Sequence, residues 1–127
     1  MNKVVYNSEY GGFALSSKAI KWLEENACEE IKKYLKNKRE KVENEYKEEE
    51  LKYMTVDELL SYNLLSEFKI PRHHPDLVRC VEELGGQANG TYSYLTIAQI
   101  DGNVYRIDEY DGMETVMEPN DYKWITI

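Results

Sequence analysis

Apolar residues recur at mostly helical spacing through the first third of the chain, separated by lysine and glutamate. This pattern predicts one long helical segment over residues 17–53, with a single narrow apolar stripe. Ser16 or Ser17 can cap its first turn. The stripe consists of Ile20, Leu23, Ala27, Ile31, Leu35, Val42 and Tyr46. The second half of the segment is so charged that we expect either an exposed helix or one that pairs with a second copy of the chain.

Two further helices are indicated by their first residues. Thr55 and Glu58 have the spacing of a capping box, which predicts a helix that ends near Phe68. Pro75 suits the first turn of another helix, which the glycine pair that starts at Gly85 should stop.

The rest of the chain has the pattern of β-strands. Residues 3–6 are typical of a short strand, and β-branched and aromatic residues between turn signals predict a four-stranded antiparallel meander at the C-terminus. Its strands cover residues 92–100, 104–109, 113–117 and 122–127. The expected fold class is therefore α+β: a long N-terminal helical region followed by a C-terminal antiparallel β-meander, with a short N-terminal strand. A length of 127 residues predicts a single domain over 1–127.

Composition supports a folded protein and restricts its partners. With 42% hydrophobic and 31% charged residues, the chain resembles ordinary globular domains. A formal net charge of −8 argues against binding duplex nucleic acid, because that affinity comes chiefly from basic side chains that neutralise phosphates. A small phosphorylated ligand is compatible with this charge, since one or two arginines act locally while salt screens distant carboxylates.

The same sequence predicts a soluble protein of the cytoplasm. No apolar run approaches the roughly 20 residues that cross a bilayer, and the N-terminus becomes polar too soon for a signal peptide. Cys28 and Cys80 lie in separate helical segments without metal-ligand spacing, so we expect two buried free thiols.

Catalytic and metal-binding motifs are not found in the sequence. There is no nucleophile elbow, phosphate-binding glycine loop or zinc-protease motif. The adjacent His73 and His74 suit loop or cap roles better than metal chelation. Residues 108–112 lack the regularly spaced oxygens of a calcium loop and are better explained as a turn. We therefore expect a binding protein, not an enzyme, with no catalytic residue, metal or cofactor.

Three residues could contact a ligand. Arg106 lies in the middle of a predicted strand, where its guanidinium could hold phosphate oxygens or pair with a carboxylate. Arg72 precedes a helix N-terminus, where it could help bind an anion or form an ion pair with Asp76 or Glu67. Asn89 could contact a purine edge or simply adopt a turn conformation. The residues alone favour the turn for Asn89, because it needs no ligand, and leave both alternatives open for the two arginines.

Several segments together resemble a family of small phage and prophage proteins, the first type of Thoeris anti-defence protein. The likeness spans both ends of the chain but not the charged stretch 36–52. The segments that carry it are Val5-Tyr6-Asn7, Tyr10-Gly11-Gly12-Phe13-Ala14-Leu15-Ser16, Arg72-His73-His74-Pro75-Asp76-Leu77-Val78, Val81-Glu82-Glu83-Leu84-Gly85, Ala88-Asn89-Gly90, Leu95-Thr96-Ile97 and Arg106-Ile107-Asp108-Glu109-Tyr110-Asp111-Gly112.

The resemblance implies a protein that sequesters a cyclic nucleotide immune signal without cleaving it. The signal is glycocyclic ADP-ribose, made by bacterial TIR-domain proteins, and some members also bind cyclic oligonucleotides at a separate site. The family forms homo-oligomers, dimers or higher, with ligand pockets at a subunit interface. Carried over to this sequence, the resemblance implies that Phe68 stacks on adenine, Asn89 contacts base or ribose, and Arg106 holds the pyrophosphate. Arg72 and Tyr110 would be their neighbours.

Two other functions are compatible with the sequence. An acidic inhibitor could block a nucleic-acid-handling host defence protein through its charged helix, although lysines interrupt the negative charge there. A nucleotide-cleaving enzyme is the third alternative, and it would return products where a sequestering protein returns the intact compound.

Overall fold

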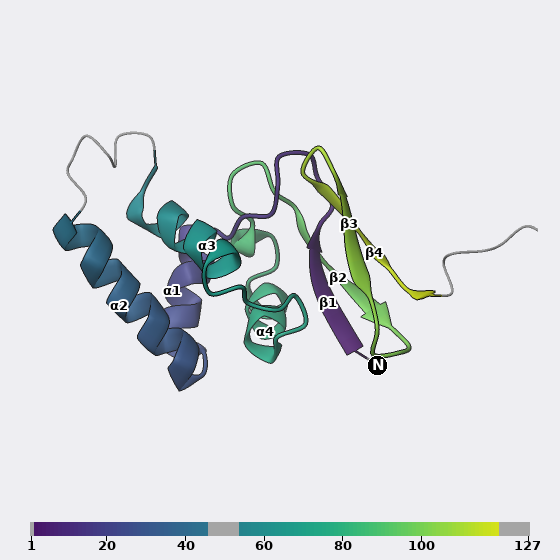
Figure 1. Cartoon of the computed structure of the whole chain (residues 1–127), viewed down its shortest axis with the longest axis horizontal. Coiled ribbons are helices and arrows are strands. Elements are labelled where there is room, and N and C mark those ends of the chain that lie inside the picture. The colour runs from purple at the N-terminus through teal and green to yellow at the C-terminus, as the bar shows by residue number, and fades with distance from the viewer. Residues whose placement is uncertain (1, 46–53, 120–127) are drawn as a thin grey trace, which may run out of the picture.

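Helices precede the C-terminal strands along the chain, which confirms the predicted α+β class (Figure 1). A computed structural model describes residues 2–45 and 54–119, and within them lie four α-helices and two small antiparallel sheets. The elements are β1 (Asn2–Asn7), α1 (Ser17–Asn26), α2 (Glu29–Glu45), α3 (Val56–Ser66), α4 (Pro75–Leu84), the 3-10 helix η1 (Gly85–Ala88), β2 (Leu95–Ile100), β3 (Arg106–Tyr110) and β4 (Met113–Met117). Among these helices, none has the length and apolar character needed to cross a bilayer.

The helix starts that the sequence predicted are confirmed. The Ser16 hydroxyl accepts from the backbone N–H of Ala19 at 3.1 Å, and the Thr55 hydroxyl accepts from that of Glu58 at 3.1 Å. The Thr55 hydroxyl also lies 3.2 Å from the Glu58 carboxylate. These caps satisfy N–H groups that have no partner within the first helical turn, and thereby fix where α1 and α3 begin.

The single long helix over residues 17–53 is wrong, because the segment breaks into α1 and α2. Ala27 ends α1 in an extended conformation with φ −75° and ψ 172°. The backbone N–H of Cys28 then donates to the Asp76 carboxylate at 2.9 Å, a bond to a distant part of the chain. The break lets α2 turn back beside α1 (Figure 1), so that Ile31 and Leu35 are fully buried. Residues 46–53 lie outside the described residues.

Charged side chains fix α2 to the rest of the molecule. The Arg39 guanidinium lies 2.6 Å from both Glu24 and Asp57, so it links three helices. Its hydrogen bond with Glu24, against the opposing effect of burial, raises the pKa of Arg39 above its usual range. The Lys38 ammonium lies 2.9 Å from Glu67, at the C-terminal end of α3. The described part of α2 is thus packed on the body of the protein.

The strand pairing differs from the predicted meander. β1 pairs antiparallel with β2, with Asn2 opposite Ile100 and Asn7 opposite Leu95, while β3 and β4 form a separate hairpin. In β1 the successive residues Val4 and Val5 are both fully buried, although their side chains point to opposite faces. Such a strand needs cover on both sides, and it contacts α4 as well as β4. The fourth predicted strand, 122–127, lies outside the described residues.

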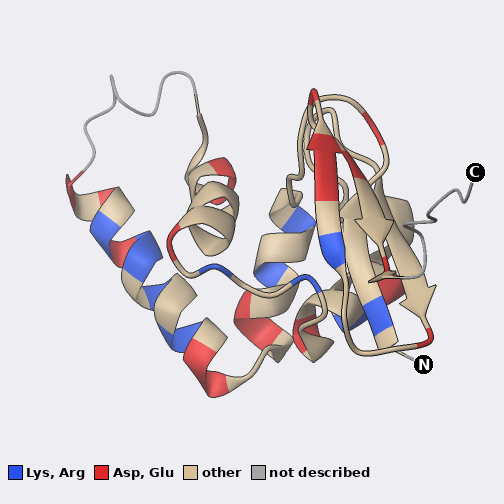
Figure 2. Cartoon of the chain, turned by 45° about the vertical axis from the view of Figure 1, so that its right-hand side comes forward, with Lys and Arg blue, Asp and Glu red and all other residues tan. Residues whose placement is uncertain are grey.

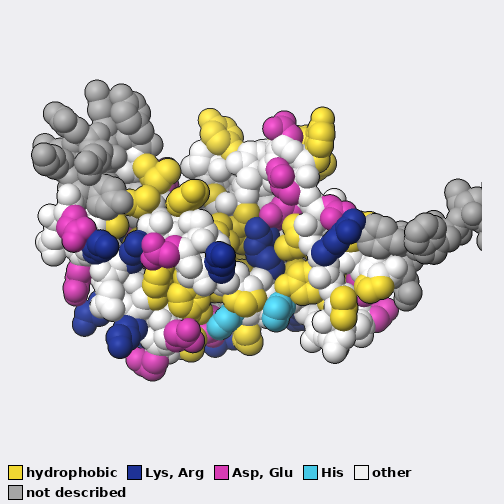
Figure 3. Space-filling model, in the orientation of Figure 1, with side chains coloured by type: hydrophobic (Ala, Val, Ile, Leu, Met, Phe, Trp, Pro, Cys, Tyr) yellow, Lys and Arg dark blue, Asp and Glu magenta, His cyan; other side chains and the backbone are white. Residues whose placement is uncertain are grey.

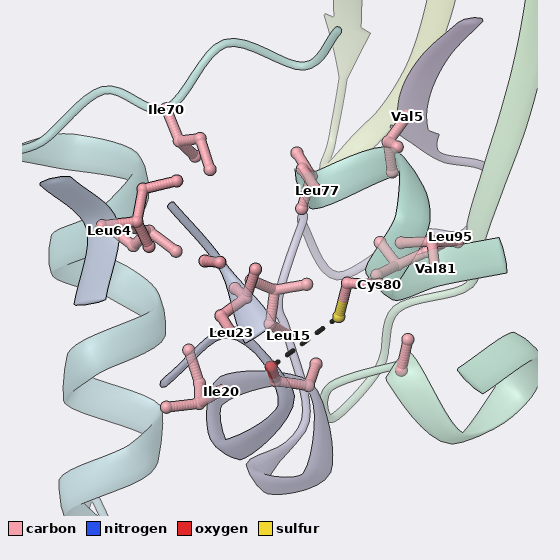
Figure 4. Packing of buried hydrophobic residues seen from close by; sticks show 14 of the residues in the cluster. Val5, Leu15, Ile20, Leu23, Leu64, Ile70, Leu77, Cys80, Val81 and Leu95 are labelled. Atoms are coloured by element: carbon pink, nitrogen blue, oxygen red, sulfur yellow. Dashed lines mark hydrogen bonds between the residues drawn. The ribbon is translucent and has the colours of Figure 1, made fainter. Parts of the chain in front are cut away.

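The core forms where α1, α3, α4 and β1 meet (Figure 4). Leu23, Leu64 and Leu77 are fully buried in it. The thiol of Cys80 is enclosed there and donates to the carbonyl of Ala19 at 3.7 Å; burial raises its pKa to about 12. The prediction of two buried thiols is confirmed for Cys80 and wrong for Cys28, which is exposed.

Candidate functional site

A fully buried asparagine holds together the loops at one end of the sheets. The side-chain oxygen of Asn7 accepts from the backbone N–H of Tyr94 at 2.8 Å. Its amide nitrogen donates to the carbonyl oxygens of Glu9 at 2.7 Å and Gly112 at 2.9 Å. One side chain therefore joins the loop after β1, the loop before β2 and the tip of the β3–β4 hairpin. Because an unpaired buried amide is unfavourable, this network fixes the relative positions of the three loops.

The three loops carry aromatic side chains that face solvent. A Cβ added to Gly11 would lie 2.6 Å from the Cβ of Tyr92, so two of the loops are in close contact. The exposed tyrosines of these loops are Tyr10, Tyr92, Tyr94 and Tyr110. Tyrosine offers a large stacking surface with few rotatable bonds, which suits it to ligand and partner contacts.

Arg72 and Glu114 form an ion pair at the base of these loops. The guanidinium donates to the two carboxylate oxygens at 2.6 and 2.8 Å, and the Glu114 side chain is only 8% exposed. Glu114 also accepts from the backbone N–H of Asn7 at 2.8 Å. The guanidinium carbon of Arg72 lies 3.9 Å from the centre of the Phe13 ring, a cation–π contact. Arg72 therefore forms an ion pair, which was the alternative to anion binding. Its partner, Glu114, is not one that the sequence suggested.

Two neighbouring pockets share one aromatic wall beside this ion pair. Their volumes are about 190 and 370 Å³, and both are lined by Phe13, Tyr62 and Leu65. We call the two together the aromatic groove. The first pocket continues to Met54 and Thr91, and the second ends at the Arg72 ion pair. Both pockets are open to solvent, so a ligand could enter the groove directly.

Phe68 and Asn89, two of the predicted ligand residues, make contacts that stabilise the fold of the chain. The Phe68 ring packs on Tyr34 with ring centres 4.9 Å apart. Burial, together with Glu67, raises the pKa of Tyr34 above its usual range. The side-chain oxygen of Asn89 accepts from the backbone N–H of Leu95 at 2.8 Å, so Asn89 positions the start of β2. This is the turn role that needs no ligand.

Arg106 and Tyr110 lie on the same face of β3, because alternate residues of a strand point to one side. The Arg106 side chain is 61% exposed and its Nε lies 2.8 Å from the Asp108 carboxylate. Tyr110 is 76% exposed at the tip of the hairpin. Asp111 and Gly112 form the predicted tight turn with positive φ angles of 50° and 87°.

The structure does not bring the five predicted ligand residues together in the aromatic groove. Arg72 lines one pocket of the aromatic groove, and neither of its two pockets is lined by Phe68, Asn89, Arg106 or Tyr110. Sequence reasoning also missed Asn7, Glu114 and Tyr62. Asn7 stands in a segment that carries the family resemblance, but nothing in the sequence marks it as buried. No sequence signal distinguishes Tyr62 from the other ten tyrosines.

The aromatic groove combines the features that recognise a planar, polar ligand. Phe13 and Tyr62 offer ring faces, and Arg72 supplies a guanidinium whose position is already fixed. Acidic side chains at the same end, Glu109 and Glu114, would disfavour a long polyanion. No protein-family model, curated protein or solved structure matches this chain.

Proposed function

We propose that this chain is a phage anti-defence protein that acts in the cytoplasm of the bacterial host. In this proposal it binds glycocyclic ADP-ribose, holds the molecule intact, and so prevents activation of the Thoeris effector. The observation that carries the proposal is the aromatic groove, in which the rings of Phe13 and Tyr62 lie next to the Arg72 guanidinium. This guanidinium is held in place by its ion pair with Glu114. The family resemblance of the sequence supports the same ligand class.

The groove residues can supply both affinity and orientation for an adenine-containing phosphate compound. Stacking of a base on an aromatic side chain contributes about 1–3 kcal/mol. A guanidinium carries five N–H donors, more than the bidentate contact between Arg72 and Glu114 uses. Because this contact already holds Arg72 in place, ligand binding would lose little side-chain entropy.

In a homo-oligomer, residues of a second subunit would complete the ligand site. Tyr110 and Arg106 share one face of β3, opposite the face from which Glu109 lines the groove, so they would contribute to the groove of a neighbouring subunit. The roles of Phe68, Asn89, Arg106 and Tyr110 in ligand binding stay predictions for the assembled oligomer.

The alternative, an acidic protein–protein inhibitor of a nucleic-acid-handling host defence protein, has less support. The surface of α2 mixes basic and acidic residues along its length (Figure 2), whereas a nucleic-acid mimic concentrates negative charge. Two of its cations, Lys38 and Arg39, are also held in ion pairs with other helices.

Tyr62→Ala should weaken the binding of glycocyclic ADP-ribose roughly tenfold to a hundredfold, because it removes one aromatic wall of the groove. Its side chain is 61% exposed, so the variant should keep its fold. Isothermal titration with the purified ligand measures the affinity.

Tyr94→Ala is the matched control for this variant. Tyr94 is exposed to almost the same extent, 59%, but does not line either pocket of the aromatic groove. We expect its affinity to equal that of the wild type. Equal affinities for the two variants would contradict the groove as the binding site, and no binding by the wild type would contradict the proposed ligand.

A further inference from the structure

Three side chains with metal-binding atoms meet where the connection between α1 and α2 lies against the start of α4. Cys28 comes from the connection between α1 and α2, and His74 and Asp76 come from the start of α4. One ligand atom of each lies within 4.8 Å of the others. Cys28 and Asp76 are 48 residues apart in the chain, so no short sequence motif indicates the cluster.

Backbone hydrogen bonds hold the three residues in this arrangement. The buried Asp76 carboxylate accepts from the backbone N–H of Cys28 at 2.9 Å. The Nδ1 atom of His74 accepts from the backbone N–H of Asp76 at 3.1 Å and lies 3.8 Å from the Asp76 carboxylate. The predicted cap role of His74 is thereby confirmed. The bonds place Nδ1 and the carboxylate side by side without a metal.

The spacing of the donors suits a tetrahedral transition metal. Zn²⁺ bonds of about 2.0–2.3 Å place neighbouring ligand atoms about 3.3–3.7 Å apart. The separation of 3.8 Å between His74 and Asp76 is close to this value. The Cys28 side chain is exposed and can close the remaining gap by rotating, since its backbone is already fixed. Figure 3 shows that both histidine side chains reach the surface, where an ion could enter.

The donor types favour zinc over magnesium or calcium. A thiolate and an imidazole are ligands of borderline and soft metals, whereas Mg²⁺ and Ca²⁺ prefer oxygen alone. The thiolate and the carboxylate together would balance the charge of a divalent ion. The Arg79 guanidinium lies 3.5 Å from the Asp76 carboxylate, so this carboxylate already has one cationic neighbour.

We propose that Cys28, His74 and Asp76 form a site for Zn²⁺ or a similar transition-metal ion, with a fourth position open to water or an external ligand. Binding requires loss of the Cys28 thiol proton and transfer of the His74 Nδ1 lone pair from the Asp76 N–H to the metal. The site is independent of the aromatic groove and of the proposed function, because none of its three residues lines the groove.

Titration of the full-length protein with Co²⁺ tests this proposal. A thiolate bound to Co²⁺ gives a charge-transfer absorption band, and we expect it to saturate at about one ion per chain and to disappear on addition of Zn²⁺. Cys28→Ser should abolish the band, although Cys80 is still present. His74→Asn should also abolish it, while asparagine preserves the helix cap.

His73→Ala is the matched control, because the neighbouring histidine is bonded to the Tyr105 hydroxyl at 2.7 Å and does not belong to the cluster. It should bind Co²⁺ like the wild type. Circular dichroism of each variant should match the wild type. The proposal is overturned if the wild type shows no thiolate band, or if the band persists in folded Cys28→Ser or His74→Asn.

Discussion

Glu114→Ala should lower the free energy of unfolding by about 3 kcal/mol, the largest effect that we expect from a single polar substitution. The change leaves the Arg72 guanidinium, which is 19% exposed, without its counter-ion. It also removes the acceptor of the buried backbone N–H of Asn7. Urea unfolding followed by circular dichroism measures the loss. The free energy of unfolding of Glu114→Gln should lie between those of the wild type and Glu114→Ala. Glutamine can still accept from the backbone N–H of Asn7 but carries no charge.

Glu82→Ala is the control for this prediction. Glu82 forms an ion pair with Lys3 at 2.9 Å, but the two side chains are 42% and 38% exposed. Solvent screens such a pair, and we expect a change below about 1 kcal/mol. If Glu114→Ala were no less stable than Glu82→Ala, the Arg72 ion pair would not be a structural centre of the protein.

Gly112→Ala should destabilise the protein by more than about 2 kcal/mol, because two unfavourable effects coincide. Gly112 has φ +87°, a conformation that alanine rarely adopts. An added Cβ would also lie 2.7 Å from the backbone nitrogen of Gly11, where no flexible side chain can move aside. The hairpin tip would have to separate from the loop after β1 and break the hydrogen bond to Asn7. The loss of stability should appear as a lower midpoint in thermal or urea unfolding.

Gly102→Ala is the matched control for Gly112→Ala, because it is the same substitution at another glycine. Gly102 lies in the connection between β2 and β3, and no atom lies within 4 Å of an added Cβ. Alanine there should change stability by less than about 1 kcal/mol, and it can stabilise by restricting the unfolded chain. Similar midpoints for the two alanine variants would show that the contact between the hairpin tip and Gly11 is unimportant for stability.

The sequence alone was sufficient to predict the local features of the fold, namely the helix caps and a tight turn. Caps act within one helical turn, so Ser16, Thr55 and Gly85 could be identified from their neighbours. Asp111 and Gly112 marked their turn for the same reason. Each of these signals depends on residues that are adjacent in the chain.

The break between α1 and α2 could not be predicted in this way. The apolar stripe continues at helical spacing from Leu23 through Ala27 to Ile31, with no glycine or proline at the break. The interruption depends on the bond from Cys28 to Asp76, which lies in a different helix. Burial of the stripe against α1 and α3 outweighs the local preference for a continuous helix.

Strand pairing and the candidate site were missed for a related reason. β1 pairs with β2 across most of the chain length, and a strand pattern carries no information about its partner. The two residues of the ion pair, Arg72 and Glu114, likewise meet only through tertiary structure. The sequence identified Arg72 as functionally interesting, but its partner decides what the guanidinium can do.

In the proposed function, the protein holds an adenine-containing phosphate compound without transforming it. The most direct test is to incubate the purified protein with glycocyclic ADP-ribose, remove free ligand, denature the protein with heat and identify the released compound by mass spectrometry. We expect the compound to be retained and then released intact. Release of cleavage products, or no retained ligand, would contradict it.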